Sequence, residues 1–384
     1  MSGAGGQTPP SRPSLLILAF SPIAQDARVR KQVALFAPDY DVTTVGYGPA
    51  PEGVVAHHEI PADLVAWHKD RLGLILRRYS SVYWGNAVVA HLRTVLPVHA
   101  FDAILADDAD TVPLALWLRP RAGVHADLHE YAPRENEESR RWRTFVAPYY
   151  RWICRTFLPR CASLTTVGAG LAEEYRREFG LEVGVVPNAT PFLDTEPTKV
   201  HEPIRLVHSG NARRNRNLGL MIDAVVNTSA PVTLDLYLMP NDPAYLAELR
   251  EQAARTERVH IHDPVPYERL VRTLTDYDVG VFVLPPITFN YLWTLPNKLF
   301  DFIQGRLGVI IGPSPEMAAL VRRHGLGEVT SDFTAAALTE TLDALDADRV
   351  RRWKRASHAV ARDLSADAGM TGWSEPIRTL LERG

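Results

Sequence analysis

Short apolar runs alternate with longer amphipathic stretches along most of this chain. Residues 15–20 (LLILAF) form an unbroken apolar run of strand length, and residues 27–36 have helical periodicity. Strands that alternate with helices favour parallel pairing through right-handed crossovers, so this part of the chain is predicted to form a doubly wound sheet. Further strands are predicted at residues 42–45, 103–106, 123–128, 164–167 and 183–186.

The same alternation restarts after a proline-rich stretch. Residues 187–203 contain four prolines and no periodicity, which is typical of a linker. Helices are predicted near residues 218–226 and 244–254. Strands are predicted at residues 204–208, 234–238, 259–262, 279–283 and 309–311.

Two Rossmann-like domains follow from this pattern. Their carboxyl strand ends are predicted to face a central cleft, because ligands of open α/β sheets bind at those ends. The predicted parts are a disordered leader (1–14), an N-terminal domain (15–195), a C-terminal domain (196–365) and a terminal helical segment (366–384).

Composition narrows the function classes. The 384 residues are 46% hydrophobic and 23% charged with a formal net charge of −3, which argues against a nucleic-acid binder. Cys154 and Cys161 stand in an aromatic-rich helical pattern and are expected to be free thiols. The leader lacks the features of a signal peptide and no apolar run reaches 18 residues, so a cytoplasmic location is expected.

A helix start at residues 295–305 (LPNKLFDFIQG) carries the most informative chemistry. Pro296 stands where the helix begins, so the free amides of its first turn favour a diphosphate, and Lys298 adds positive charge. Asp301 lies one turn later, where a carboxylate could accept hydrogen bonds from ribose hydroxyls. An ordinary capped helix with a solvated Lys and Asp remains an alternative.

A basic loop after the first strand of the second domain is the next candidate site. Gly210 permits close approach of a ligand to the backbone, as a phosphate-binding turn requires. Arg213, Arg214 and Arg216 follow, and guanidinium groups suit bidentate phosphate contacts. A solvated basic loop is the alternative.

These segments resemble the donor site of GT-B glycosyltransferases, particularly the large retaining group known as family 4. Pro296, Asn297, Lys298 and Asp301 match its P-N-K-x-F-E motif, with Asp in place of Glu, and Trp293 replaces the first glutamate of its usual pair. The resemblance implies that the second domain binds a nucleotide sugar and that the terminal helix crosses back to the first. It assigns the diphosphate to Lys298 and Arg216 and places the base near Val265.

The first domain carries candidate acceptor residues under the same resemblance. Asp26 and Arg30, together with Arg28, match a D-x-R-x-R pattern after the first strand, although a helix cap with surface arginines is an equal alternative. His129 ends a predicted strand and is expected to contact the transferred sugar or the acceptor as a catalytic residue. The other expected acceptor contacts are Asp107, Asp108 and Glu130.

Two patterns that suggest other chemistry are discounted. Asp108 and Asp110 form a D-x-D sequence, which holds a metal in another transferase fold, but here Thr111 and Pro113 lead straight into a helix. His125, Asp127 and His129 alternate on one strand face, and a polar strand end explains them better than a metal site. No metal is therefore predicted.

Residues 140–160 mix arginines with aromatic side chains. A basic amphipathic helix can lie on an anionic membrane, so weak association with the inner membrane face is considered beside the alternative of an ordinary packed helix.

The resemblance therefore implies a hexosyltransferase-type enzyme that uses a UDP-, GDP- or dTDP-sugar and requires no cofactor. The resemblance implies transfer to a hydroxyl of a glycan, lipid-linked or small-molecule acceptor with retention of configuration. Two alternatives remain open: a sugar-nucleotide epimerase of the same fold, and a catalytically silent partner subunit, which Trp293 would suit.

Overall fold

The computed structural model describes residues 12–383, so most of the predicted leader lies outside the described residues. The chain divides into two compact units. The first contains the chain up to Thr166 together with Ala172–Val186 and the segment from Met370 onwards. The second contains Val167–Leu171 and Pro187–Gly369.

The first unit is built on a parallel sheet of seven strands in the order β3-β2-β1-β4-β5-β6-β7. This is the Rossmann order with one short strand added at the edge. Strand β1 lies inside the sheet and its residues 15–19 are buried, which explains its continuous hydrophobic sequence. The strands are β1 (Ser14–Pro22), β2 (Asp41–Tyr47), β3 (Ala56–Ile60), β4 (Ala103–Asp107), β5 (Gly123–Leu128), β6 (Ser163–Thr166) and β7 (Gly184–Val185).

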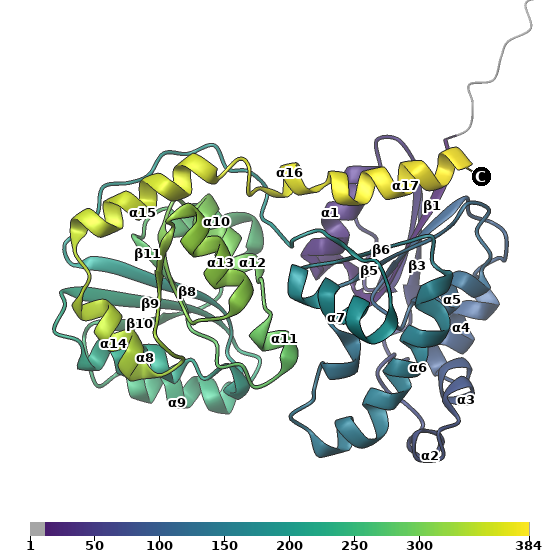
Figure 1. The fold of residues 1–384 in the computed structure, drawn as a ribbon, viewed down its shortest axis with the longest axis horizontal. Coiled ribbons are helices and arrows are strands. Elements are labelled where there is room, and N and C mark those ends of the chain that lie inside the picture. Colours follow the sequence, from purple (N-terminus) through teal and green to yellow (C-terminus); the bar gives the residue numbers. More distant parts are fainter. Residues whose placement is uncertain (1–11, 384) are drawn as a thin grey trace, which may run out of the picture. The chain divides into compact units, whose positions relative to one another are not determined.

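Helices cover the sheet of the first unit, and the terminal helix α17 lies against α1 (Figure 1). Trp373, Ile377 and Leu380 of α17 are buried in the same hydrophobic core as β1. The α-helices are α1 (Ala27–Phe36), α2 (Arg71–Ile75), α3 (Tyr79–Trp84), α4 (Ala87–Val95), α5 (Val112–Trp117), α6 (Ala147–Phe157), α7 (Ala169–Phe179) and α17 (Thr371–Arg383). Shorter turns are η1 (Ile23–Gln25), η2 (Ala132–Arg134), η3 (Trp142–Val146) and η4 (Leu158–Arg160).

The second unit repeats the architecture with six parallel strands in the order β10-β9-β8-β11-β12-β13. This is again the Rossmann order, and two hydrophobic clusters fill the two sides of the sheet. The strands are β8 (Ile204–Asn211), β9 (Val232–Met239), β10 (Val259–His262), β11 (Val279–Phe282), β12 (Gly308–Ile311) and β13 (Gly327–Val329). The helices are η5 (Arg214–Arg216), α8 (Gly219–Asn227), α9 (Pro243–Ala253), α10 (Tyr267–Leu274), α11 (Phe289–Leu292), α12 (Asn297–Gln304), α13 (Pro315–His324), α14 (Ala335–Asp343), α15 (Ala347–Val360) and α16 (Ala366–Gly369).

The prediction of two doubly wound α/β domains is confirmed. The strand order reverses between β1 and β4 in the first unit and between β8 and β11 in the second, so each sheet has a crevice at that point. The pattern missed the two short edge strands β3 and β13, whose residues are mostly partly exposed. Among residues 12–383, no helix combines the length and the apolar character that crossing a bilayer requires.

Candidate functional sites in the two units

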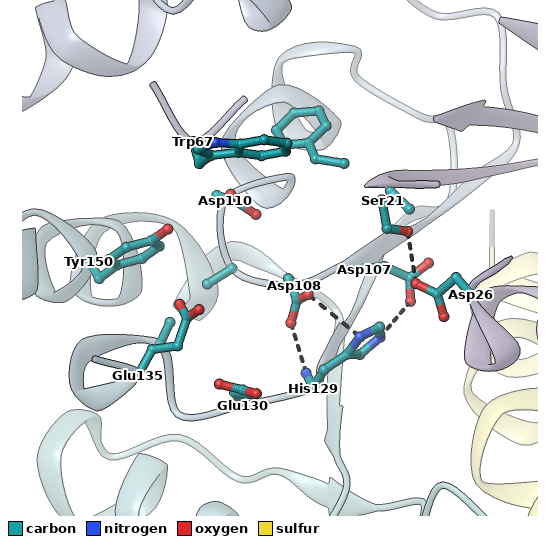
Figure 2. Close-up of a pocket in the computed structure, with 14 residues that line it drawn as sticks. Ser21, Asp26, Trp67, Asp107, Asp108, Asp110, His129, Glu130, Glu135 and Tyr150 are labelled. Carbon is teal, nitrogen blue, oxygen red and sulfur yellow. Dashed lines mark hydrogen bonds and ion pairs between the residues drawn. The ribbon is translucent and has the colours of Figure 1, made fainter. Parts of the chain in front are cut away.

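A cavity of about 320 Å³ lies at the carboxyl end of the sheet in the first unit (Figure 2). Its walls come from the segments that follow β1, β4 and β5, at the point where the strand order reverses. Such crevices are the usual ligand sites of open α/β sheets. The lining residues are Ala19, Phe20, Ser21, Asp26, Trp67, Asp107, Asp108, Ala109, Asp110, His129, Glu130, Ala132, Glu135 and Tyr150.

The imidazole of His129 lies between two carboxylates of this cavity. Its Nε2 is 3.2 Å from Oδ1 of Asp107, and its Nδ1 is 3.5 Å from Oδ2 of Asp108. Burial acts to lower the His129 pKa, but the charges of Asp108 and Asp107 outweigh it and raise the pKa to about 10. At neutral pH His129 is therefore an imidazolium, which donates hydrogen bonds and carries positive charge rather than acting as a base.

The backbone of Asp108 holds its carboxylate in place. Asp108 has a φ of 67°, a left-handed conformation that costs a non-glycine residue about 1 kcal/mol or more. Its amide donates to the carbonyl of Asp127 (2.8 Å), and its Oδ1 accepts from the His129 amide (2.9 Å). Strained backbone of this kind, fixed by its surroundings, is common where a side chain must be positioned for function.

Sequence reasoning missed the role of Arg28, which is buried beneath the cavity. Its guanidinium donates to both carboxylate oxygens of Asp127, at 2.6 and 2.7 Å, and to the carbonyl of Val186. Burial alone would raise the Asp127 pKa, but the guanidinium holds it well below its usual range. The alternative in which the arginines lie on the helix surface is therefore wrong for Arg28, which is 1% exposed. An aspartate within a buried strand needs a positively charged partner. Asp127 in the sequence of β5 was therefore the signal that a buried basic residue such as Arg28 lies beside it.

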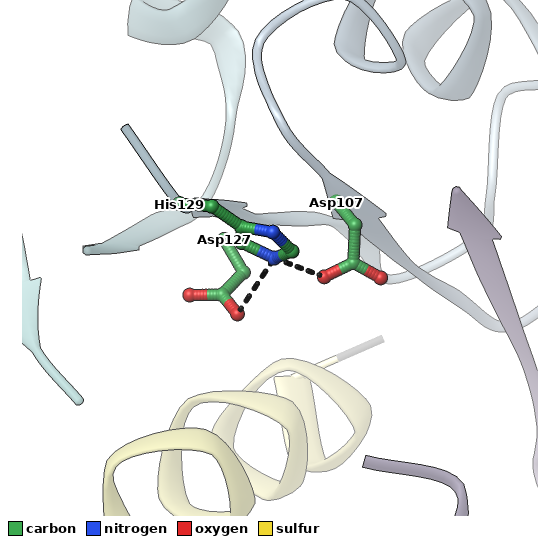
Figure 3. Close-up of side chains that lie close together, drawn as sticks. All are labelled: Asp107, Asp127 and His129. Carbon is green, nitrogen blue, oxygen red and sulfur yellow. Dashed lines mark hydrogen bonds and ion pairs between the residues drawn. The ribbon is translucent and has the colours of Figure 1, made fainter. Parts of the chain in front are cut away.

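Asp107, Asp127 and His129 offer ligand atoms that all lie within 4.8 Å of one another (Figure 3). Both Asp127 oxygens, however, already accept from Arg28, and Thr165 and Gln32 donate to them as well. A divalent cation would have to bind beside a guanidinium and displace the proton of His129. The donor set therefore disfavours a metal.

Four of the five predicted acceptor contacts line the cavity. Asp26 does so while capping α1, where it accepts from the amides of Arg28 and Val29 and from the hydroxyl of Ser21. The helix-cap alternative is thus correct for Asp26, which also lines the cavity. Arg30 is exposed and is not among the lining residues.

In the second unit, Gly210 and Lys298 meet where the strand order reverses. Gly210 is the next-to-last residue of β8 and has a φ of 152°, and a Cβ placed on it would lie 3.1 Å from the Lys298 Nζ. Desolvation and the positive charge of Arg216 lower the Lys298 pKa to about 8, although Asp301 acts in the opposite direction. A lysine that is costly to charge in the free protein is stabilised when an anion binds beside it.

The three arginines of the following loop have different surroundings. Arg216 is half-buried and close to the Tyr291 ring (5.8 Å), and its Nε has no hydrogen-bond partner among the described residues. Arg214 instead forms a bidentate ion pair with Glu248 at 2.7 Å. Arg213 is exposed. Arg216 thus remains the best-placed arginine for a diphosphate near Lys298.

The helix-start residues lie as the motif suggests. Pro296 is the N-cap of α12, so the first amides of the helix are open, and Asn297 begins the helix. Asp301 is 3% exposed and its Oδ1 accepts from the Thr190 hydroxyl at 2.5 Å, so this carboxylate already has a partner within the unit. Val265 lies half-buried in the loop between β10 and α10.

His208 is a second residue that sequence reasoning missed. Its Nδ1 lies 2.9 Å from the carbonyl of Val281 and must donate to it, which leaves Nε2 as an acceptor beside Gly210. Desolvation, with the charges of Lys298 and Arg216, lowers the His208 pKa to about 3, so the ring is neutral. The signal was a histidine in an apolar strand directly before Ser-Gly.

Trp293, at the position of the absent glutamate, has a packing role. Its ring lies against Gly170, also in the second unit, where an added Cβ would be 2.0 Å from the indole. The Gly170 amide donates to Glu316. Trp293 therefore occupies space at this position and offers no carboxylate to a sugar.

The segment 140–160 contains α6, which turns most of its apolar side inward. Tyr149, Ile153 and Phe157 are buried in the first unit, and Trp142 stacks on Tyr150. Membrane association through this segment stays a prediction. It would depend on contacts between the solvent-exposed arginines of the segment and the lipid headgroups. Cys154 and Cys161 are both free thiols, as expected.

Comparison with known proteins identifies the fold but not a family. No protein-family model and no curated protein matches the sequence. HepE from Anabaena, solved with UDP and glucose, matches with a TM-score of 0.67 at 14% identity, over 95% of this chain and 99% of that one. Sucrose-phosphate synthase from Thermosynechococcus elongatus matches with a TM-score of 0.73 at 13% identity, over 97% and 100% of the two chains.

WaaG, a glycosyltransferase involved in lipopolysaccharide biosynthesis, matches with a TM-score of 0.62 at 12% identity, over 94% of this chain and 99% of that one. The similarity extends over both units and nearly the full length of each of these structures. The chain therefore has the GT-B fold, and that prediction is confirmed.

Proposed function

We propose that this protein is a glycosyltransferase that moves a sugar from a nucleoside diphosphate sugar to a hydroxyl of an acceptor. One observation carries the proposal: Lys298 lies beside Gly210 at the crevice of the second unit, and the charge of Arg216 acts on it. Neither cation forms an ion pair with any residue in the part of the chain that the structure describes. A desolvated lysine and a nearby arginine without an ion pair, beside open helix amides, favour binding of a diphosphate.

The chemistry follows from where charge develops. When the bond from the sugar to the diphosphate breaks, negative charge grows on the leaving group. Lys298, Arg216 and the amides of α12 would stabilise it. His129, as an imidazolium in the other unit, would act on the sugar or the acceptor by donating hydrogen bonds. Retention of configuration is part of the proposal and rests on the family resemblance.

UDP-sugars are the first donors to test. HepE, which shares this fold, has been solved with UDP and with UDP-glucose. We propose a UDP-hexose on this basis, with GDP- and dTDP-sugars as the other candidates. Asp301 would reach the ribose only if it exchanged its hydrogen bond with Thr190 for one to the nucleotide.

Titration calorimetry with UDP, GDP, dTDP and ADP tests the donor site. One nucleotide is expected to bind, and Lys298→Ala should abolish that binding while Lys199→Ala, an exposed lysine of the same unit, leaves it intact. Transfer is then followed by nucleotide release with a panel of sugar, polyol and lipid-linked acceptors. If the donor sugar is epimerised when no acceptor is present, the protein is an epimerase instead. If a nucleotide binds but no turnover is detected, the protein is a silent subunit.

A further inference from the structure

The cavity of the first unit is strongly acidic. Six of its fourteen lining side chains are carboxylates and a single one, His129, is basic. A site for a neutral sugar usually offers both hydrogen-bond donors and acceptors, whereas the side chains that line this cavity are mostly acceptors. The six carboxylates are Asp26, Asp107, Asp108, Asp110, Glu130 and Glu135.

One of these carboxylates, Asp107, lacks a partner that its burial calls for. Asp107 is 2% exposed and lines the cavity, and its Oδ1 accepts from His129 and Gln32. Its Oδ2 is buried and has no hydrogen-bond partner among the described residues. Asp110 is partly buried and its one hydrogen bond is to its own backbone, and the exposed Glu135 carboxylate has no hydrogen bond or ion pair within residues 12–383. Buried acceptors without donors are costly, so they favour a ligand that supplies donors.

The nearest ammonium group of the protein does not satisfy them. Lys69 acts electrostatically on Asp110 and on Glu135, but its Nζ lies over the rings of Tyr149 and Tyr150, at 5.7 and 5.2 Å. Desolvation raises the Asp110 pKa to about 6 in spite of Lys69. Asp110 is therefore ionised near neutral pH. Desolvation and the charges of Glu130 and Asp108 raise the Glu135 pKa to about 8, so Glu135 gives up its proton when a cation binds beside it.

Aromatic rings border the same side of the cavity. Figure 2 shows Trp67, Tyr150 and Glu135 on the side where Asp110 lies, with Ser21 and Asp26 on the other. The Trp67 side chain is 67% exposed. Such rings pack against the apolar face of a sugar or cyclitol ring and attract ammonium groups.

We propose that this cavity binds an acceptor that carries a protonated amine beside its hydroxyls, as amino sugars and aminocyclitols do. The ammonium group lies between Asp110 and Glu135, and the ring packs on Trp67 with its hydroxyls directed to Asp107 and His129. The assignment of this ligand as the acceptor rests on the proposed function, but its binding to the cavity does not.

Three matched ligands test the proposal by calorimetry on the full chain at pH 7.5. They are methyl α-glucosaminide, its N-acetyl derivative and methyl α-glucoside, which share one ring and differ in charge. The amine is expected to bind at least about tenfold more tightly than either neutral ligand, as a charge-assisted contact would give. Equal binding of all three, or binding of none at 50 mM, overturns the proposal.

Charge-neutral variants locate the site. In the double variant Asp110→Asn, Glu135→Gln the preference for the amine should fall below about threefold, because the ion pairs are lost. The double variant Asp63→Asn, Glu138→Gln makes the same change at exposed positions outside the cavity and should keep the full preference. Preserved preference in the first variant overturns the proposal. So does saturable binding of MgCl2 or MnCl2 that competes with the amine and is lost in that variant, because it would make the cavity a metal site.

Nucleotide binding measured on the same samples separates this proposal from the proposed function. If the amine binds but no nucleotide does, the cavity assignment stands and the glycosyltransferase assignment fails. If a nucleotide binds and sugar is transferred only to neutral acceptors, the reverse holds.

Discussion

The Arg28 guanidinium and the Asp127 carboxylate form a bidentate ion pair in the core of the first unit, with contacts of 2.6 and 2.7 Å. Arg28 is 1% exposed and Asp127 is fully buried. The pair joins α1 to β5, and the ring of Trp373 on α17 lies 4.5 Å from the guanidinium carbon. Because Arg28 neutralises Asp127, the charges that raise the pKa of the adjacent His129 are those of Asp108 and Asp107.

Replacement of Arg28 should destabilise the protein strongly. Arg28→Gln leaves buried Asp127 with only the longer contact to the His129 Nε2 (3.8 Å) as charge compensation, which is expected to lower the free energy of unfolding by about 3–5 kcal/mol. Arg121→Gln breaks an exposed pair with Asp102 by the same chemical change and should cost less than about 1 kcal/mol. Urea denaturation measures both values.

The double variant Arg28→Gln, Asp127→Asn completes this test. It removes the buried charge together with its partner, so part of the lost free energy of unfolding should return. If Arg28→Gln and Arg121→Gln unfold at the same urea concentration, the ion pair does not contribute as proposed.

His129 is expected to stay protonated throughout the neutral range. Since Asp108 and Asp107 raise its pKa to about 10, the ring signals of His129 should not titrate between pH 6 and 8.5 in NMR spectra. His129→Gln assigns the signals by their disappearance. In Asp108→Asn the pKa of His129 should fall, because the first of the two raising charges is gone. A midpoint near 6.5 in the unmodified protein would contradict the imidazolium assignment.

Most of the fold could be predicted from the sequence because both sheets are parallel and their inner strands are buried. The buried strands read as unbroken apolar runs, and α1 was expected at the residues where it lies. Strand β3 (AHHEI) was missed because it is an edge strand whose residues are mostly partly exposed, so its pattern resembles that of a loop.

The candidate sites were predictable only in part. Polar residues at strand ends, such as His129 and Gly210, stand out because ligands bind at the carboxyl ends of parallel strands. The partners of buried charges do not stand out, since the sequence does not show which distant side chains meet. Arg28 with Asp127 is the example in the first unit.

The affinity for a nucleoside diphosphate should fall at alkaline pH. Lys298 has a pKa lowered to about 8, so its ammonium form is lost above that pH while the ligand keeps its charge. The dissociation constant should then rise by up to about tenfold per pH unit, since one proton is coupled to binding. Lys298→Arg keeps the charge at all these pH values and should remove the slope. A slope that persists in this variant would show that another group is responsible.

A methyl group on Gly210 should weaken nucleotide binding, and a second glycine with a positive φ provides a matched control. Gly210→Ala places a Cβ 3.1 Å from the Lys298 Nζ on a backbone with a φ of 152°, so the cation must move. Gly180→Ala also forces alanine into a positive φ, of 68°, but meets no atom within 4 Å. Both variants should lose about 1 kcal/mol of stability through backbone strain. Gly210→Ala alone should weaken nucleotide binding, by at least about tenfold if the displaced ammonium loses one charge-assisted contact. Equal affinity in the two variants would place the diphosphate away from Gly210 and Lys298.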